Sequence, residues 1–291
     1  MLAPLALVAV TAVWGVTFVQ VKDAVALYPL FAFLAVRFAI ATATLAPVAA
    51  ARVRRLDRRG FAAGVLLGAF VAVGYGLQTT GLDLTTVSGT GFITGMYVVL
   101  TPVVAFLLFR DRVTAAGAAG IALAFVGMAM LSGIEAGSTA GNLLVLAATV
   151  AWAFHIAVTG RFAPARDPLA LAFVQMATAF VGFAVVAVAL GQIELPRGWT
   201  VWGALLVTGV FASALAIAIQ TWAQRRMSAA RVAVVYAMEP LFAGLFGYAL
   251  AGDRLGALGW GGCALILLGI VVSEPEAAGD IRKAVSGRSV R

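Results

Sequence analysis

Long apolar runs separated by short charged clusters form the dominant pattern along the 291 residues of this chain. A helix of roughly 20 apolar residues crosses a bilayer, and most of these runs reach that length. Two further runs reach it only if one charged residue is accepted inside each, namely Arg37 and Glu239. With these included, the pattern predicts ten membrane-spanning helices, over residues 1–21, 24–51, 60–82, 84–109, 113–134, 136–160, 168–193, 198–224, 232–252 and 255–273.

An internal repeat relates the first part of the chain to the second. Residues 111–131 align without a gap to residues 253–273, and eight of the aligned positions are identical. Residues in other spans pair at nearly the same distance: Gln78 with Gln220 at an offset of 142, and Trp14 with Trp152 and Arg37 with Gln175 at an offset of 138. Each half then holds five spans, and an odd number makes the second half enter the membrane from the opposite side.

The predicted fold is therefore an all-α integral membrane protein with ten transmembrane helices arranged as two inverted five-helix repeats. The first repeat covers residues 1–134 and the second covers residues 135–273. Residues 274–291 are rich in charged and small residues, which predicts a disordered cytoplasmic tail. Because the two inverted halves are fused in one chain, we expect the protein to act as a monomer.

Composition and charge support a membrane protein. Hydrophobic residues make up 63% of the chain and charged residues 11%, whereas soluble domains average about 45–50% and about 25%. The net charge of +8 would also suit a protein that binds nucleic acid. However, sixteen Lys and Arg fall in one set of alternate loops and only three in the other, namely Lys22, Arg197 and Arg254. By the positive-inside rule, this asymmetry predicts cytoplasmic termini. The expected partner is thus the lipid bilayer and not nucleic acid.

Apart from tyrosine and cysteine, three ionisable side chains lie well inside predicted spans: Arg37, His155 and Glu239. A charged group at the centre of a membrane helix costs roughly 3 kcal/mol, so such residues usually face a cavity or a partner. Glu239 is followed by Pro240, which cannot donate a hydrogen bond to the carbonyl of Tyr236. Tyr236 and Glu239 also share a helix face at a spacing of three residues. The sequence therefore predicts a polar patch of acid, phenol and free carbonyl.

Other polar and aromatic residues recur on single helix faces, which is typical of helices that line a wetted interior. Pro102, in the other half, frees the carbonyl of Val98 in the same way, although the two prolines are not at equivalent positions. Packing alone also explains the aromatic residues, and Arg37 and His155 suit a structural role as well as a substrate role. The predicted cavity lining is Trp14, Arg37, Tyr75, Gln78, Tyr97, Trp152, His155, Tyr236 and Glu239.

Four segments resemble the EamA family of the drug/metabolite transporter superfamily. They are WGVTFVQVK at 14–22, RF at 37–38, EPLFAGLFGYALAGDRL at 239–255 and GGCALILLGIVV at 261–272. The resemblance implies a ten-helix inner-membrane carrier that exports amino acids or related metabolites, with spans five and ten outside the cavity. Small members of the superfamily carry a proton-binding glutamate in the first span, but here that span reads AVTAVWGVTFV. Proton coupling therefore does not follow from the resemblance, and Glu239 is the one carboxylate inside a predicted span that is left to supply it. Glu239 either binds a substrate or a proton, or else it locks helices together.

These features predict a secondary transporter that works by alternating access at a midplane cavity, with a small-molecule substrate and protons as a candidate coupling ion. An exporter of cationic drugs, a lipid-translocating protein and a channel remain open alternatives. An enzyme is disfavoured because one acid and one histidine inside the membrane supply neither a carboxylate pair nor a metal site. No phosphate-binding loop of an ATPase occurs in the chain, and no cofactor is expected.

Overall fold

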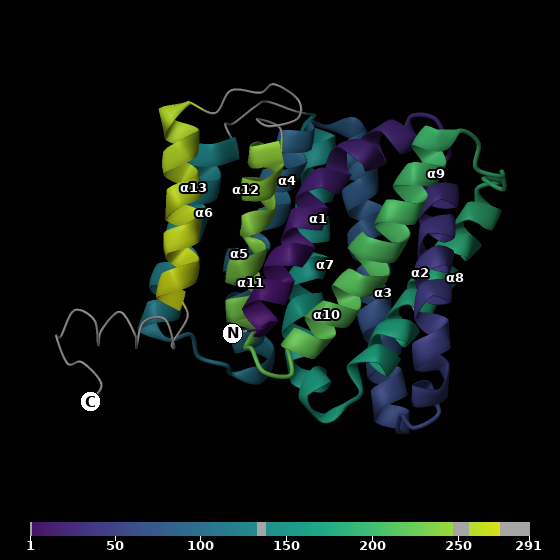
Figure 1. Ribbon diagram of the computed structural model, residues 1–291, viewed down its shortest axis with the longest axis horizontal. Helices are drawn as coiled ribbons and strands as arrows, with labels where there is room; N and C mark the ends of the chain where they lie inside the picture. The colour runs from purple at the N-terminus through teal and green to yellow at the C-terminus, as the bar shows by residue number, and fades with distance from the viewer. Residues whose placement is uncertain (1, 133–137, 247–255, 274–291) are drawn as a thin grey trace.

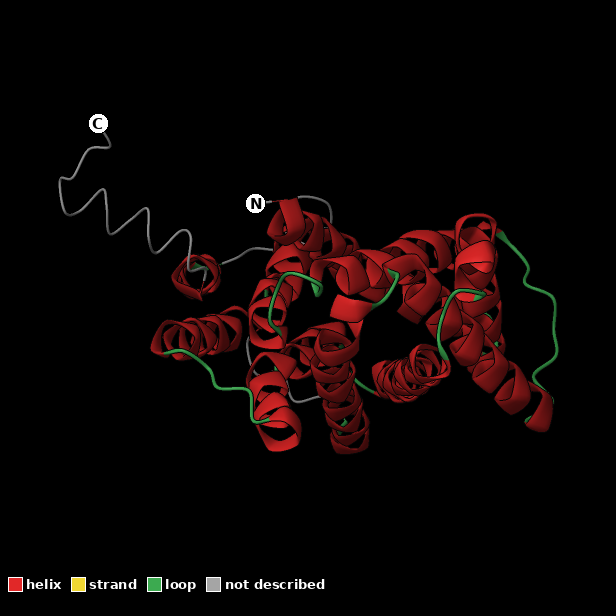
Figure 2. Cartoon of the chain, turned by 90° about the horizontal axis from the view of Figure 1, so that it is seen from below, coloured by secondary structure: helices red, strands yellow, loops and turns green. Residues whose placement is uncertain are grey.

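The computed structural model describes residues 2–132, 138–246 and 256–273, and every regular element in these ranges is a helix (Figure 1). Figure 2 shows the same helices from below, joined by loops, with no strand in the described part of the chain. Seven helical segments are long and apolar enough to cross a membrane, and two shorter apolar helices cover Ala115–Met130 and Ala257–Ser273. The protein is therefore an all-helical, multi-pass membrane protein. The predicted tail at 274–291 lies outside the described residues.

The first six helices follow one another up to residue 132: α1 Leu2–Val25, α2 Leu30–Val53, α3 Arg58–Leu84, α4 Val87–Gly95, α5 Tyr97–Phe109 and α6 Ala115–Ser132. The remaining elements are α7 Thr139–Phe162, the 3-10 turn η1 Ala163–Ala165, α8 Pro168–Ala189, α9 Trp199–Leu206, the π-helical segment η2 Val207–Leu215, α10 Ala216–Ala223, α11 Ala229–Tyr236, α12 Met238–Phe246 and α13 Ala257–Ser273. The helices are expected because a bilayer core has no water to bond to the backbone, and a helix pairs its N–H and C=O groups internally.

Two predicted spans are interrupted helices. The span predicted at 84–109 consists of α4 and α5, separated at Met96, and the span predicted at 232–252 contains α11 and α12, separated at Ala237. Pro102 lies inside a continuous α5, so the hydrogen bond that this proline cannot donate to Val98 does not end that helix. The residue 142 positions after Met96 is Met238, which adjoins Ala237. The two interruptions therefore fall at nearly corresponding points of the chain.

Helices α6 and α13 pack as a separate pair at one edge of the bundle (Figure 1). Their backbones touch at glycines: a Cβ on Gly120 would lie 2.6 Å from the carbonyl oxygen of Gly269, and a Cβ on Gly127 would lie 2.6 Å from that of Gly262. Small residues at such positions let membrane helices approach closely. Glycine at these positions therefore allows the backbones of α6 and α13 to touch.

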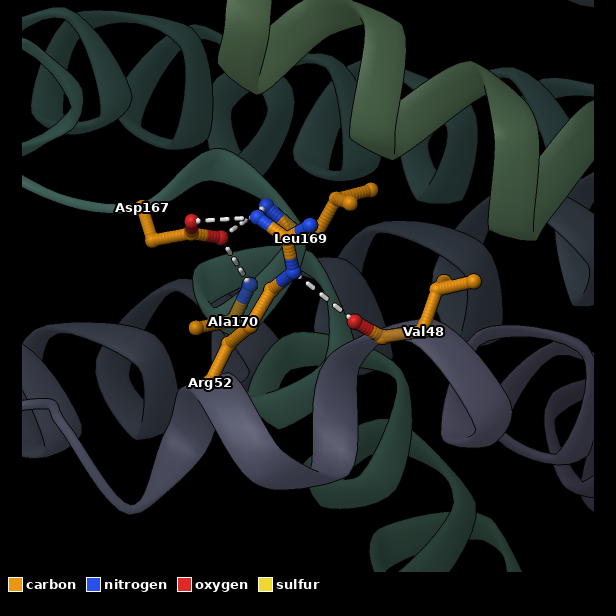
Figure 3. A network of polar contacts seen from close by, with 5 residues as sticks. All are labelled: Val48, Arg52, Asp167, Leu169 and Ala170. Carbon is orange, nitrogen blue, oxygen red and sulfur yellow. Dashed lines mark hydrogen bonds and ion pairs between the residues drawn. The ribbon is translucent and has the colours of Figure 1, made fainter.

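Helices α2 and α8 lie against each other in the main body of the bundle, and contacts tie them together at both ends. At one end, Arg52 Nη1 lies 3.0 Å from Asp167 Oδ2, as Figure 3 shows. At the other end, the Tyr28 hydroxyl donates to the carbonyl of Glu194. Because the C-terminal end of α2 meets the start of α8, the two helices run antiparallel.

Asp167 has a second role as the N-cap of α8. Its Oδ1 accepts hydrogen bonds from the backbone N–H groups of Leu169 and Ala170, each at 3.0 Å. Partial burial opposes the charge of Asp167, but the hydrogen bonds from Ala170 and Arg52 outweigh it, so the pKa of this carboxyl lies below its usual range. A group with a lowered pKa contributes stability above its unfolded-state pKa and loses it as the pH falls through the folded-state pKa.

The two roles of Asp167 predict different costs for two substitutions. Asp167→Asn keeps the cap but removes the charge, and we expect it to cost less than about 1 kcal/mol, as exposed ion pairs do. Asp167→Ala also removes the cap and is expected to cost about 1 kcal/mol more. Unfolding of the purified protein in detergent measures both, and the gap between wild type and Asp167→Asn is expected to close as the pH falls below about 4. A gap that stays constant with pH would contradict the ion pair.

The glycine contacts between α6 and α13 predict that Gly127→Ala lowers the free energy of unfolding by about 1–3 kcal/mol, because the added methyl group overpacks the contact. Gly203→Ala in α9 is the matched control, since a Cβ there meets no atom within 4 Å. That variant is expected to be stabilised by roughly 0.5–1 kcal/mol, the usual difference between alanine and glycine in a helix. Equal shifts of the melting temperature in both variants would refute the close contact.

Candidate functional site

A cavity in the middle of the bundle lies among helices that are far apart in sequence. The space open to the centre of a water molecule is about 50 Å³, which suffices for a few waters at roughly 10–15 Å³ each. Its walls come from α1, α2, α3, α4, α5, α7, α10, α11 and α12. The lining residues are Trp14, Thr17, Phe18, Val21, Arg37, Tyr75, Gln78, Thr79, Leu82, Thr94, Tyr97, Trp152, Ile156, Gln220, Tyr236 and Glu239.

Eight of the nine residues predicted for the cavity lie in its wall, and His155 does not. On α7, Trp152 and Ile156 face the cavity. His155 is three residues after Trp152 and meets its ring edge to face at 5.9 Å, but its Nε2 is 2.8 Å from Gln175 Oε1 on α8. The predicted lining role of His155 therefore does not match this cavity, because its imidazole bonds to a side chain behind the wall.

The interruption of the helix at Ala237 brings Glu239 and a free carbonyl into the cavity wall. The Tyr97 hydroxyl lies 3.0 Å from the carbonyl oxygen of Tyr236 and 3.0 Å from Glu239 Oε2. The Tyr236 carbonyl is the one that Pro240 deprives of its helical donor, so the predicted carbonyl and acid lie together. The phenol that bonds both belongs to Tyr97 and not, as predicted, to Tyr236, whose hydroxyl has no hydrogen-bond partner among the described residues. One hydroxyl has one proton, and Tyr97 therefore shares it between two acceptors. Glu239 also stands in the first turn of α12, where the helix dipole favours an anion.

Arg37 is a second charged group in the wall, and only 3% of its surface is exposed. Its Nε donates to Ser213 Oγ at 2.9 Å, and its guanidinium carbon lies 4.2 Å from the centre of the Tyr75 ring. Ion pairs in the described ranges include Arg52 with Asp167 and Arg166 with Asp57, but none involves Arg37 or Glu239. Within that part of the chain, Arg37 and Glu239 are thus a buried cation and a buried acid that face one cavity without an oppositely charged partner.

Aromatic rings occupy much of the wall between these charges. Trp14 meets Tyr236 edge to face with ring centres 4.8 Å apart, and Tyr75 meets Trp152 in the same way at 4.7 Å. Trp14 Nε1 and the Tyr75 hydroxyl both donate to the carbonyl of Ala212, at 2.8 and 3.2 Å. Ala212 belongs to the π-helical segment η2, and such segments occur frequently at functional sites.

Two buried donors in the wall have no hydrogen-bond acceptor among the described residues. They are Trp152 Nε1 and the Tyr236 hydroxyl, and both residues line the cavity. An unsatisfied buried polar group costs about 1–3 kcal/mol. Both atoms are fully enclosed in this conformation, so a bound molecule with acceptor atoms would remove that cost once the cavity widens. The wall can accordingly bind a polar molecule with an apolar part.

Gln220 is the main polar residue of the wall that the sequence did not predict. Its repeat partner Gln78 was predicted, and the offset of 142 between them was the signal that pointed to it. Gln78 donates through Nε2 to Thr94 Oγ1 at 2.9 Å. For metals, no group of three or more His, Cys, Asp or Glu side chains suited to an ion occurs in the described ranges.

The shared hydroxyl of Tyr97 predicts a specific cost for its removal. Tyr97→Phe leaves the carbonyl of Tyr236 and the acid of Glu239 without this donor, and we expect the free energy of unfolding in detergent to fall by about 1–3 kcal/mol. Tyr236→Phe is the matched control, because it removes a hydroxyl that has no partner and is expected to be neutral or stabilising. Similar losses in the two variants would show that the Tyr97 hydrogen bonds do not hold the interrupted helix.

Comparisons with known proteins identify the family. The model of the EamA-like transporter family matches residues 1–133 and 139–273. A protein from Archaeoglobus fulgidus named "Uncharacterized transporter" is 34% identical over 270 residues, covering 93% of this chain and 85% of its own. The Bacillus subtilis protein named "Uncharacterized transporter YyaM" is 23% identical over 229 residues, covering 75% of this chain and 74% of its own.

The fold also matches a solved structure titled "Crystal structure of protein". The TM-score is 0.77 at 22% sequence identity, and the match covers 95% of this chain and 98% of the other. That likeness concerns the fold alone, whereas the family match spans nearly the whole sequence. This chain therefore belongs to the EamA-like transporter family and is a multi-pass membrane transporter.

Proposed function

We propose that this transporter is a secondary carrier that exports amino acids or related small metabolites by alternating access. The observation that carries the proposal is that Arg37 and Glu239, neither of which has an oppositely charged partner in the described ranges, line one aromatic cavity. An amino acid is a zwitterion, so its carboxylate can meet Arg37 while its ammonium group meets Glu239 or an aromatic face. Trp152 Nε1 and the Tyr236 hydroxyl supply further donors for the carboxylate.

The architecture proposed for this carrier has ten membrane crossings in two inverted repeats, residues 1–134 and 135–273. The two stretches that match the family model, 1–133 and 139–273, coincide with these halves. The glycine contacts also support the repeat. The offset of 142 relates Gly120 to Gly262 and Gly127 to Gly269. The contact of Gly120 with Gly269 therefore becomes the contact of Gly262 with Gly127 when the two halves are exchanged, as a two-fold axis requires.

The interrupted helices support a midplane site in this architecture. The pairs α4–α5 and α11–α12 form the fourth span of each proposed half. Interrupted helices at corresponding positions of two repeats are the usual frame of a substrate site in secondary transporters. Tyr97 and Glu239, which are 142 residues apart, meet where these two spans approach each other. Because the halves are fused and the cavity lies within one chain, the carrier acts as a monomer.

We place the protein in a bacterial inner membrane, and the charges of its loops orient both termini toward the cytoplasm. Because the described cavity holds only a few waters, a larger solute requires it to widen. Alternating access supplies such a change when the two halves rock against each other. Glu239 is the acid available for proton coupling inside the proposed membrane region.

A second candidate is export of cationic organic compounds. The observation that favours it is the group of aromatic rings beside Glu239, namely Trp14, Tyr97 and Tyr236, because aromatic faces and an acid together attract cations. Such a carrier would not depend on Arg37. Loss of transport in Arg37→Gln therefore separates a zwitterionic substrate from a purely cationic one.

The direct test is flux of a labelled amino-acid panel and of cationic dyes in proteoliposomes, with and without a pH gradient. We expect saturable flux of an amino acid, a reduction of roughly tenfold in Trp152→Ala, as loss of about 1.4 kcal/mol of binding implies, and loss of the pH response in Glu239→Gln. Flux of dyes without amino acids would favour the second candidate, and non-saturable flux would indicate a channel. A pH response that is unchanged in Glu239→Gln would leave Glu239 a structural or substrate role.

A further inference from the structure

A chain of buried amide side chains lies directly behind the cavity, on the side of α10. Gln224 Nε2 donates to the backbone carbonyl oxygen of Ile156 on α7 at 2.7 Å. Gln220 Nε2 lies 3.0 Å from Gln224 Oε1. Both glutamines are buried, with 1% of their surface exposed. Gln220 is the member of this chain that reaches the cavity wall.

The hydrogen bonds determine which way each amide points. A backbone carbonyl can only accept, so Gln224 must turn its NH₂ group toward Ile156 and its Oε1 toward Gln220. Gln220 must then present its own NH₂ group to Gln224. The orientations of both amides therefore follow from the hydrogen bonds, because the backbone carbonyl of Ile156 can only accept.

His155 extends the same pattern on the other side of Gln220. Gln220 Nε2 lies 3.4 Å from His155 Nδ1, so this ring nitrogen accepts. The imidazole then carries its proton on Nε2 and donates it to Gln175 Oε1 at 2.8 Å. Both contacts of the Gln220 side chain thus use its nitrogen. Its oxygen makes no hydrogen bond within the described part of the chain, and it is not among the fully enclosed polar atoms there.

We propose that Gln220 is a specificity-determining residue of the cavity, whose Oε1 accepts a hydrogen bond from an N–H group of the transported solute, and that Gln224 is the positioning residue that aims it. The proposal rests on the proposed function, because it concerns the same cavity. It narrows the solute to one with an N–H donor, which in an amino acid is the ammonium group. A solute that lacks N–H donors leaves Oε1 unpaired and binds more weakly.

The repeat partner of Gln220 lacks this fixed direction. Gln78 donates to a threonine hydroxyl on Thr94, and a hydroxyl can donate as well as accept. The amide of Gln78 can therefore reverse without losing its bond, whereas that of Gln220 cannot. Recognition of the amine is accordingly a property of the second half of the chain.

Four variants of the purified protein in proteoliposomes test the proposal. Gln220→Met removes the acceptor at similar side-chain length, Gln220→Glu keeps an acceptor, and Gln224→Met removes the group that aims Gln220. The control is Thr221→Val, because the Thr221 hydroxyl bonds within its own helix to the carbonyl of Ile217 and lies outside the cavity wall. The readouts are KM and maximal rate for a labelled amino acid that the wild type moves. Inhibition by the matching carboxylic acid, which lacks the amino group, is measured alongside.

We expect Gln220→Met to raise KM by roughly tenfold or more, since a hydrogen bond to a charged group contributes about 1.5–3 kcal/mol. The inhibition constant of the carboxylic acid is expected to stay unchanged in this variant. Gln220→Glu keeps an acceptor but loses the N–H groups that bond Gln224 and His155, so it is expected to raise KM less than Gln220→Met does. Gln224→Met is expected to raise KM with little loss of maximal rate. Thr221→Val is expected to behave as wild type.

An unchanged KM in Gln220→Met, or equal losses for the amino acid and the carboxylic acid, would overturn the proposal. If Gln220→Met does not fold, KM of Gln224→Met is compared with that of wild type, and an unchanged KM overturns the proposal. Should the wild type move a labelled primary amine but no amino acid, amino-acid export fails as the function, and KM for the amine in Gln220→Met then tests the inference. If the wild type moves neither kind of compound, both proposals are wrong.

Discussion

A bilayer core offers no water to the backbone, so every interruption of a membrane helix must find its hydrogen bonds inside the protein. The cavity of this transporter is bounded by the side chains that meet this demand. Tyr97 satisfies the carbonyl that the α11–α12 interruption frees at Tyr236, and Trp14 and Tyr75 satisfy Ala212 in the π-helical segment. The aromatic wall of the cavity therefore results from the irregular backbone that it supports.

The cost of burying charge accounts for the second feature of the cavity. Arg37 is held by Ser213 and the face of Tyr75, and Glu239 by Tyr97 and the start of α12. These neutral partners offset only part of the loss of water, because a buried charge is fully compensated only by hydrogen bonds together with an opposite charge. In the proposed carrier, a zwitterionic solute offsets the rest, because its carboxylate can meet Arg37 while its ammonium group meets Glu239.

The two halves of the chain are similar in sequence but differ at some positions of the cavity and its surroundings. Positions paired by the repeat are similar at Trp14 and Trp152 and at Gln78 and Gln220, but Arg37 corresponds to Gln175. The similar pairs line the cavity on both sides, whereas Arg37 faces the cavity and Gln175 binds His155 behind it. In the proposed carrier, recognition of a carboxylate by Arg37 thus depends on a position at which the two halves differ.

The sequence alone determined the membrane class, the helices and most of the polar residues of the cavity. These predictions succeed because the length of an apolar run and the presence of Arg37 or Glu239 within one can be read directly from the sequence. The first indicates a membrane span, and the second indicates a side chain that is costly to place in lipid. The prediction that Pro240 frees the carbonyl of Tyr236 succeeds for the same reason, since it depends on residues four apart. The family resemblance noted in the sequence is likewise confirmed by the family match.

Only the tertiary structure decided which acceptor or donor each polar group meets. The position of the interruption at Met96, the absence of His155 from the wall and the direction of the Gln220 amide all depend on contacts between helices far apart in sequence. A helix face seen in isolation does not specify its neighbour, because several packings can bury the same apolar stripe. The residues of the site are therefore readable from the sequence, but their hydrogen-bond partners are set by how the helices pack.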